Sequence, residues 1–193
     1  MTVRWGVIGC GRVATIRTIP EGIAAASNAE LVATADSRPD RARKAADQFG
    51  GRVYDSPQAL LDDNRVDAVY IATPPYAHAE LTVAAARAGK HVLCEKPMAM
   101  DPQQAETMAR AVQEEGVTFG IGFMMRYHTC HATLKELIDE GAIGTLVALR
   151  ARYSVWSPEV VPGDLGDWQH TLKYAGGGPL FDMGVHAIDL FNF

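Results

Sequence analysis

A short apolar run leads directly into a glycine-rich turn near the start of the chain, and this junction constrains the fold more than any other feature. Residues 4–8, RWGVI, are followed by residues 9–14, GCGRVA, and then by a helical pattern of apolar residues. Gly9 permits a tight turn, Gly11 lets the backbone approach a pyrophosphate, and Ala14 keeps the helix close to the sheet. The amide-rich start of such a helix favours phosphate groups. The pattern predicts a dinucleotide-binding βαβ unit for a nicotinamide or a flavin cofactor.

The end of the next apolar run bears on the choice of cofactor. Residues 30–35 run into Asp36, about 20 residues beyond the glycine motif, where a carboxylate accepts hydrogen bonds from an adenosine ribose. Asp36 would repel a 2′-phosphate, whereas Arg38 could pair with one. Because Asp36 lies at the end of the strand itself, we expect NAD, with NADP as the alternative.

Charge and cysteine content exclude several classes of protein. The chain has 193 residues and a net charge of −5, and it lacks a basic cluster, which argues against a nucleic-acid partner. Its apolar runs are too short to span a membrane, and the first strand begins too close to Met1 for a signal peptide, so we expect a cytoplasmic protein. Cys10, Cys94 and Cys130 have no paired spacing and are expected to be free, buried thiols.

Strand-like and helix-like segments alternate along the chain, which predicts the α/β class with a doubly wound, mainly parallel sheet and helices on both faces. Pro39, Ser56 and Asp101 mark helix starts, and Gly89 is placed as a helix C-terminal cap. Pro20 falls inside the apolar pattern of the first helix, so we expect a kink or a split there. We expect helices over residues 39–49, 57–61, 77–88 and 102 to near 116, and strands over residues 66–72, 91–94, 117–121 and 144–155.

Open parallel sheets bind ligands beyond the carboxyl ends of their strands, which selects the loops at residues 9–13, 36–38, 73–78 and 95–97. The Pro74-Pro75 pair makes a rigid turn that could pack against the cofactor, or could be an ordinary proline-rich turn. Lys96 lies between a carboxylate and a proline directly after a buried strand. A cis Lys96–Pro97 bond and burial beside Glu95 would fix the position of the ammonium group.

Several segments together resemble the glucose-fructose oxidoreductase and inositol dehydrogenase family, also called Gfo/Idh/MocA. The resemblance implies a Rossmann domain followed by an α/β substrate domain, and NAD(P)-dependent oxidation or reduction of sugars, polyols and related compounds. It also implies tight cofactor binding and assembly as dimers or tetramers. The similar segments cover nearly the whole chain: the glycine turn, Asp36, residues 72–75 with His78, residues 89–97 (GKHVLCEKP), residues 122–126, the helix 134–140 closed by Gly141, and residues 176–186 (GGGPLFDMGVH).

The resemblance sets the expected domains. Residues 1–122 would form the NAD(P)-binding Rossmann domain, and residues 123–193 the beginning of an incomplete α/β (α+β) substrate and oligomerisation domain. A family member would continue well past Phe193, and this chain stops inside an apolar helical pattern. We therefore expect a truncated polypeptide whose last helix exposes apolar side chains.

The resemblance also assigns catalytic residues. Lys96 matches the lysine of the family's EKP motif, and Asp182 and His186 match the acidic residue and the histidine of the substrate pocket. If residues 180–191 are helical, Asp182 and His186 share one face. His186 is expected to remove the hydroxyl proton as hydride leaves, and to return it in the reverse reaction. Lys96 would stabilise the developing negative charge, and Asp182 would bind a neighbouring hydroxyl or tune the other two.

Other residues have less specific interpretations. Arg126 could approach the nicotinamide or the substrate, or could be a solvated surface arginine. Asp189 could join Asp182 and His186 in a metal site, but a further ligand is lacking, and we expect no metal. Trp168 could line a sugar pocket or lie in the core. The expected cofactor-binding residues are Gly9, Gly11, Arg12, Val13, Asp36, Ser37, Arg38, Thr73, Pro74, His78, Glu95, Lys96 and Arg126.

The function expected from these residues is hydride transfer between a nicotinamide cofactor and a sugar or polyol, by a protein that is a homo-oligomer at full length. Two alternatives stay open: a glycosidase of the same superfamily that uses bound NAD transiently, and a non-catalytic nucleotide-binding module. Lys96, Asp182 and His186 in one chain favour simple dehydrogenation.

Overall fold

The computed structural model describes residues 1–153 and 172–193. The described chain forms two compact units, Met1–Ile121 and Gly122–Phe193. Within the described residues, no helix is both long enough and apolar enough to cross a membrane.

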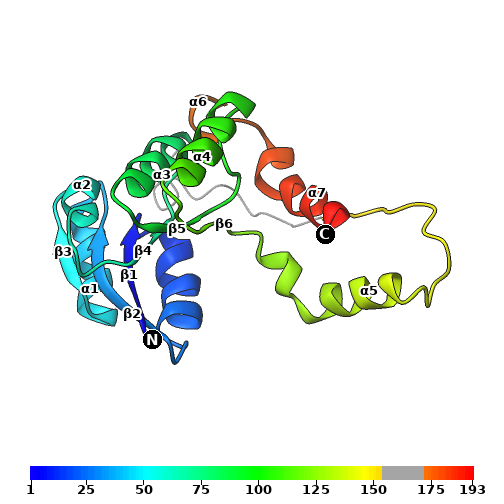
Figure 1. The fold of residues 1–193 in the computed structure, drawn as a ribbon, viewed down its shortest axis with the longest axis horizontal. Coiled ribbons are helices and arrows are strands. Elements are labelled where there is room, and N and C mark those ends of the chain that lie inside the picture. Colours follow the sequence, from blue (N-terminus) through cyan, green and yellow to red (C-terminus); the bar gives the residue numbers. More distant parts are fainter. Residues whose placement is uncertain (154–171) are drawn as a thin grey trace, which may run out of the picture. The chain divides into compact units, whose positions relative to one another are not determined.

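The first unit is built on a six-stranded sheet with the order β3-β2-β1-β4-β5-β6 (Figure 1). Each neighbouring pair of strands is parallel. The chain therefore moves outward from β1 to β3, returns to the other side of β1 as β4, and continues to β6. This reversal between β1 and β4 is the point where doubly wound sheets bind nucleotides. The strands are β1 Val3–Ile8, β2 Ala29–Ala35, β3 Arg52–Tyr54, β4 Ala68–Ile71, β5 His91–Cys94 and β6 Phe119–Ile121.

Helices cover both faces of this sheet, as the sequence predicts. Alternate residues of a strand point to opposite faces, so Ile8 enters the apolar cluster that contains Leu60 and Met108, and Val7 enters the cluster that contains Ile19. The helices are η1 Ala14–Ile23, α1 Pro39–Phe49, α2 Pro57–Leu61, the short η2 Pro75–Ala77, α3 His78–Arg87 and α4 Pro102–Glu114.

The predicted helix starts are confirmed, and side-chain caps explain two of them. The Ser56 side chain accepts a hydrogen bond from the backbone N of Ala59, and Asp101 accepts one from Gln104. Each capped helix then begins with proline, which needs no hydrogen bond at that position. Gly89, with φ of +70°, follows α3 in the left-handed conformation that ends many helices.

Helix η1 differs from its prediction. It is not split at Pro20 but runs as one element from Ala14 to Ile23 in π-helical geometry. The backbone N of Ala24 donates to the Ile19 oxygen at 2.7 Å, a bond that spans five residues instead of four. Because proline has no N–H and its ring needs room, a wider turn accommodates Pro20 without ending the helix.

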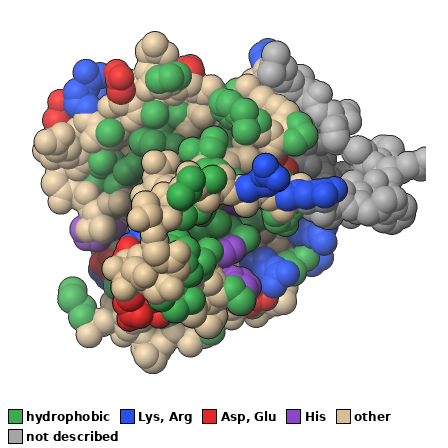
Figure 2. Space-filling view, turned by 90° about the vertical axis from the view of Figure 1, so that its right-hand side faces the viewer, with side chains coloured by type: hydrophobic (Ala, Val, Ile, Leu, Met, Phe, Trp, Pro, Cys, Tyr) green, Lys and Arg blue, Asp and Glu red, His purple; other side chains and the backbone are tan. Residues whose placement is uncertain are grey.

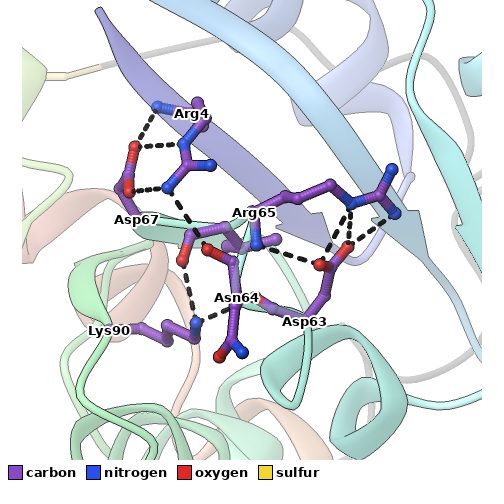
Figure 3. A network of polar contacts seen from close by, with 7 residues as sticks. Arg4, Asp63, Asn64, Arg65, Asp67 and Lys90 are labelled. Carbon is purple, nitrogen blue, oxygen red and sulfur yellow. Dashed lines mark hydrogen bonds and ion pairs between the residues drawn. The ribbon is translucent and has the colours of Figure 1, made fainter. Parts of the chain in front are cut away.

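Polar side chains tie together the amino ends of the central strands, at the edge of the sheet away from the predicted ligand loops (Figure 3). Arg4, in β1, donates to both carboxylate oxygens of Asp67, which precedes β4, at 2.6 and 2.9 Å. The largely buried Lys90, which precedes β5, donates to the backbone oxygens of Asp63 and Val66 at 2.9 and 2.8 Å. These bonds fix the entry to β4 from two sides.

The second unit contains little apolar core among its described residues. Only His186 and Asp189 are buried within that described part. Ile188 and Phe191 are exposed on the last helix, which confirms the expected exposure of its apolar side chains, and Leu134 is exposed on another helix of this unit. Figure 2 shows hydrophobic side chains exposed in several places on the face that it draws. The described helices are η3 Met124–Tyr127, α5 Thr129–Asp139, α6 Leu172–Ala175, η5 Leu180–Gly184 and α7 Val185–Asn192.

Two further expectations need correction, and one strand was not anticipated. Residues 144–153 form neither helix nor strand, so the strand expected to begin at residue 144 is wrong over that stretch, and the rest of it lies outside the described residues. Strand β3 is an addition to the expected elements, because three residues are too few for a periodic pattern. All three cysteines are free, but Cys130 is exposed and only Cys10 and Cys94 are buried.

Candidate functional site

The glycine turn combines a tight backbone contact with open space. Gly9 has φ of +95°, and a Cβ atom placed on it would lie 2.7 Å from the backbone of Ala72, the residue after β4. The turn is therefore pressed against the end of β4, and only glycine fits there. A Cβ atom on Gly11 would meet nothing within 4 Å. The close approach needed for a pyrophosphate is thus available at Gly11, as the motif predicts.

Asp36 holds the glycine turn in place. Its Oδ2 accepts a 2.6 Å hydrogen bond from the backbone N of Cys10, and its Oδ1 accepts a 2.8 Å bond from the backbone N of Arg38. Sequence reasoning assigned Asp36 to the ribose alone, whereas the structure shows that it also joins the end of β2 to the turn. Each carboxylate oxygen has a second lone pair, so both roles are compatible.

The thiol of Cys10, inside this turn, is expected to be unreactive. Burial and the nearby charge of Asp36 raise the pKa of Cys10 to about 12, so the thiol stays protonated at neutral pH. The Arg38 side chain, by contrast, is exposed and lies 3.3 Å from Asp40 in an ion pair. Ser37, Arg12 and Val13 are exposed as well.

The loop after β4 is tied to the loop after β5 by His78. The ring is fully buried, with Nδ1 2.8 Å from the Pro97 oxygen and Nε2 2.9 Å from the Thr73 oxygen. Burial lowers the pKa of His78, which favours the neutral ring with a single N–H. Both ring nitrogens face backbone oxygens, which only accept hydrogen bonds, so the neutral ring donates to one of the two loops and packs against the other. Thr73 has a buried hydroxyl without a hydrogen-bond partner in the described structure, and it suits a ligand that supplies one.

The loop after β5 carries Lys96, and the Lys96–Pro97 peptide bond is cis, as anticipated. Glu95 Oε1 accepts a 2.6 Å hydrogen bond from the hydroxyl of Tyr70, and Oε2 accepts a 3.2 Å bond from the backbone N of Lys96. Sequence reasoning missed Tyr70. The available signal was a tyrosine inside an otherwise apolar strand, because a buried phenol needs a polar partner.

The second unit holds Arg126, Asp182 and His186. Elements η5 and α7 follow one another directly, so the helix expected over residues 180–191 is present, with its first part in π geometry. Asp182 is exposed, whereas His186 is buried and meets the ring of Phe123 edge to face at a centroid distance of 6.2 Å.

Arg126 has a role that neither interpretation of the sequence included. Its guanidinium binds both carboxylate oxygens of the buried Asp189, with Nε 2.7 Å from Oδ2. A carboxylate in the apolar pattern of α7 was the available signal, because a buried charge needs a partner. In the described ranges 1–153 and 172–193, no three His, Cys, Asp or Glu side chains gather as a metal site would require.

The structure thus brings one group of predicted residues together. Gly9, Asp36, Thr73 and Lys96 each lie just after a strand of the parallel sheet, and parallel neighbours end at the same edge. Arg126, Asp182 and His186 belong to the other unit. Trp168 lies outside the described residues.

Comparisons with known proteins identify the family of both units. Residues 3–123 match the family model described as oxidoreductase family, NAD-binding Rossmann fold. Residues 131–193 match the model described as GFO/IDH/MocA C-terminal domain.

Individual relatives are sugar-related reductases. The chain is 38% identical to the dTDP-3,4-didehydro-2,6-dideoxy-alpha-D-glucose 3-reductase of Actinomadura kijaniata, over 96% of this chain and 54% of that protein. It is 37% identical to the 1,5-anhydro-D-fructose reductase of Ensifer adhaerens, over 98% of this chain and 56% of that protein. It spans about half the length of the curated relatives it matches.

Two solved structures show the same fold. One is a 3-ketoreductase from Actinomadura kijaniata in complex with NADP and TDP-benzene, with a TM-score of 0.80 and 35% identity over 97% of this chain and 56% of that one. The other is an NAD-binding protein from Listeria innocua, with a TM-score of 0.84 and 32% identity over 99% of this chain and 54% of that one. The glycine turn, the strand order and these matches together show that the chain belongs to the Gfo/Idh/MocA family of oxidoreductases.

Proposed function

We propose that the protein transfers hydride between a nicotinamide cofactor and a CH–OH or C=O group of a sugar, a polyol or a related compound. The observation that carries this proposal is the open approach at Gly11, flanked by Asp36 and by the buried hydroxyl of Thr73, at the same sheet edge as Lys96. Relatives named as a dTDP-sugar 3-reductase, an anhydrofructose reductase and a myo-inositol 2-dehydrogenase support this substrate class.

The residues after the strands fit the parts of a dinucleotide. The amide-rich turn over residues 9–13 would receive the pyrophosphate, and residues 36–38 the adenosine ribose. Thr73, Pro74, Glu95 and Lys96 would lie toward the nicotinamide, and when bound this cofactor supplies or accepts the hydride. His78 would hold these residues in position through its ring, which faces the backbone oxygens of Thr73 and Pro97.

We propose NAD as the preferred form of the cofactor. The carboxylate of Asp36, which accepts hydrogen bonds from two backbone amides, supports this preference because it would repel a 2′-phosphate. NADP stays the alternative, since the solved 3-ketoreductase contains NADP and the exposed Arg38, two residues after Asp36, could pair with a phosphate.

Three residues are proposed to carry the chemistry. His186 would take the hydroxyl proton during oxidation and return it during reduction. Lys96 would orient the reacting oxygen and stabilise its negative charge, and Asp182 would bind a neighbouring hydroxyl. We propose that Arg126, held by Asp189, lies near the nicotinamide or the substrate.

The domain assignment is also a proposal. Residues 1–122 would be the cofactor domain and residues 123–193 the beginning of the substrate and oligomerisation domain. We propose a homo-oligomer for the full-length protein, as the family resemblance implies, and three free thiols suit a cytoplasmic location.

A panel assay of the full-length protein tests the proposed function. Inositols, aldoses, anhydro sugars and dTDP-sugars are offered with NAD, NADP or their reduced forms, and absorbance at the reduced-nicotinamide band is recorded. Net turnover of free cofactor supports the proposal. Cleavage of a glycoside without net cofactor reduction favours the NAD-using glycosidase, and binding of cofactor without any reaction favours a nucleotide-binding module.

A further inference from the structure

A buried hydrogen-bonded chain reaches the loop that carries Lys96. The hydroxyl of Tyr70 donates to Glu95 Oε1 at 2.6 Å, and the other oxygen of Glu95 accepts from the backbone N of Lys96 at 3.2 Å. Tyr70 lies inside β4 and is 1% exposed. The carboxylate of Glu95 is therefore held at both oxygens, once by the core of the sheet and once by the peptide unit of Lys96.

The same hydroxyl is bound from the opposite side. Thr18 Oγ1 donates to the Tyr70 oxygen at 2.9 Å, and Thr18 belongs to helix η1, which follows the glycine turn. A carboxylate can only accept, so the single phenolic proton points to Glu95 and leaves a lone pair for Thr18. Three side chains thus join the helix of the phosphate-binding turn to the Lys96 loop.

The direction of these bonds is stable over the pH range in which proteins function. Burial and the charge of Glu95 raise the pKa of Tyr70 far above its usual value, so the hydroxyl keeps its proton. A low-dielectric environment also strengthens a short bond to a carboxylate.

We propose that Tyr70 is a positioning residue, which fixes Lys96 through Glu95 and links its placement to helix η1 through Thr18. This inference rests on the proposed function, in which the ammonium of Lys96 orients the reacting oxygen. Tyr70 touches neither cofactor nor substrate in this scheme. Its contribution is to hold the peptide unit of Lys96, since small displacements of a reacting group reduce rates strongly.

If Tyr70 had only a structural role, a different result would be expected. If the Tyr70–Glu95 bond only stabilised the core, its loss would lower the melting temperature and leave kcat unchanged. The other end of the loop is anchored separately, because His78 lies 2.8 Å from the oxygen of Pro97. Tyr70→Phe removes one oxygen atom and leaves this second anchor in place, so we expect the variant to fold.

The test uses the full-length protein and the substrate found in the panel assay. We expect Tyr70→Phe to lower kcat by about 10- to 100-fold, while the dissociation constant of the cofactor, measured by calorimetry, changes by less than about threefold. Hydrogen exchange of the Lys96 backbone amide, measured without substrate, should accelerate by about tenfold, since Glu95 is no longer held.

A double-mutant cycle shows whether Tyr70 acts through Glu95. In a Glu95→Ala background, the additional Tyr70→Phe change should lower kcat by less than about twofold. Thr18→Val, at a partly exposed helix position, should lower kcat by about two- to fivefold and serves as the second variant if Tyr70→Phe does not fold.

Tyr54→Phe is the matched control, because Tyr54 also bonds a carboxylate, that of Asp63, in the first unit. Its kcat should equal that of the wild type. A Tyr70→Phe enzyme with normal kcat, or multiplicative effects of Tyr70→Phe and Glu95→Ala, would overturn the inference. The Lys96→Ala variant distinguishes failure of the proposed function from failure of this inference. Normal turnover of Lys96→Ala would overturn the role of Lys96 itself. An inactive Lys96→Ala enzyme together with a normal Tyr70→Phe enzyme would overturn only the role of Tyr70.

Discussion

Lys96 and His186 have different roles in the proposed reaction: Lys96 stabilises negative charge on the reacting oxygen, and His186 transfers the proton. Lys96 lies in a loop anchored by Glu95 and Pro97, and His186 is buried in α7 of the other unit. Neither side chain belongs to the glycine turn that would bind the pyrophosphate. We predict that Lys96→Ala and His186→Ala each keep the cofactor dissociation constant within about threefold and lower kcat by about 10²- to 10⁴-fold.

Calorimetry with NAD and steady-state kinetics measure these effects. Lys44→Ala and His128→Ala are suitable controls, because both side chains are exposed and lie outside the proposed site. Near-normal rates in both Lys96→Ala and His186→Ala would rule out the catalytic assignment.

The ion pair between Arg4 and Asp67 gives the protein a specific sensitivity to acid. The hydrogen bond from Arg4 lowers the pKa of Asp67 from 3.8 to about 2. A carboxylate with a lower pKa in the folded state binds fewer protons there, so its stabilisation is fully present above pH 3.8. That stabilisation is lost as the pH falls through this window toward about 2.

We therefore predict that Asp67→Asn lowers the melting temperature at pH 7 by about 2–6 °C, and by clearly less at about pH 3. Thermal unfolding followed by circular dichroism at both pH values measures the difference. Asp47→Asn, which changes an exposed carboxylate of α1, should leave both melting temperatures unchanged. An equal loss at the neutral and the acidic pH would contradict the role of the charge.

At the scale of elements, the turn between β1 and η1 contains one glycine that the fold requires, Gly9, and one that ligand binding would require, Gly11. A Cβ atom at Gly9 would meet backbone at 2.7 Å, whereas one at Gly11 would meet nothing within 4 Å. We predict that Gly9→Ala lowers the melting temperature by more than about 5 °C. Gly11→Ala should leave it within about 1 °C and weaken cofactor binding by more than about tenfold, because the methyl group fills the space needed by the pyrophosphate.

Melting curves without ligand and calorimetric titrations with NAD test this pair of variants. A Gly11→Ala protein with normal affinity would show that the open space at the turn is not where the cofactor approaches.

Local sequence patterns predict some helices and site residues of this chain and miss others. The sequence predicts helix α1 at its observed bounds, because Pro39 begins it and a polar and apolar periodicity follows. It does not predict the π-helical course of η1, in which a bond from the Ala24 backbone N to the Ile19 oxygen spans five residues around Pro20. In the site, Asp36 and Lys96 stand out because they follow apolar runs. Tyr70 does not, because its partners Thr18 and Glu95 lie 52 and 25 residues away in sequence.

At the scale of the whole molecule, the two units differ in how they are stabilised. Among the described residues, the buried apolar clusters consist entirely of residues from the first unit, on both faces of its sheet. In the second unit, the only buried residues among those described are His186 and Asp189, and both are polar. The hydrophobic driving force for folding is thus concentrated in one part of the described chain.

We predict that a fragment of residues 1–122 folds alone and binds NAD within about tenfold of the affinity of the longer chain, because its core is complete. A fragment of residues 123–193 should show no cooperative thermal transition, because it buries too few apolar side chains to offset the conformational entropy of an ordered chain. Circular dichroism melting curves of both fragments, with calorimetry for NAD, measure this contrast. A cooperative transition in the second fragment, or an unfolded first one, would show that stability is distributed differently from the buried clusters.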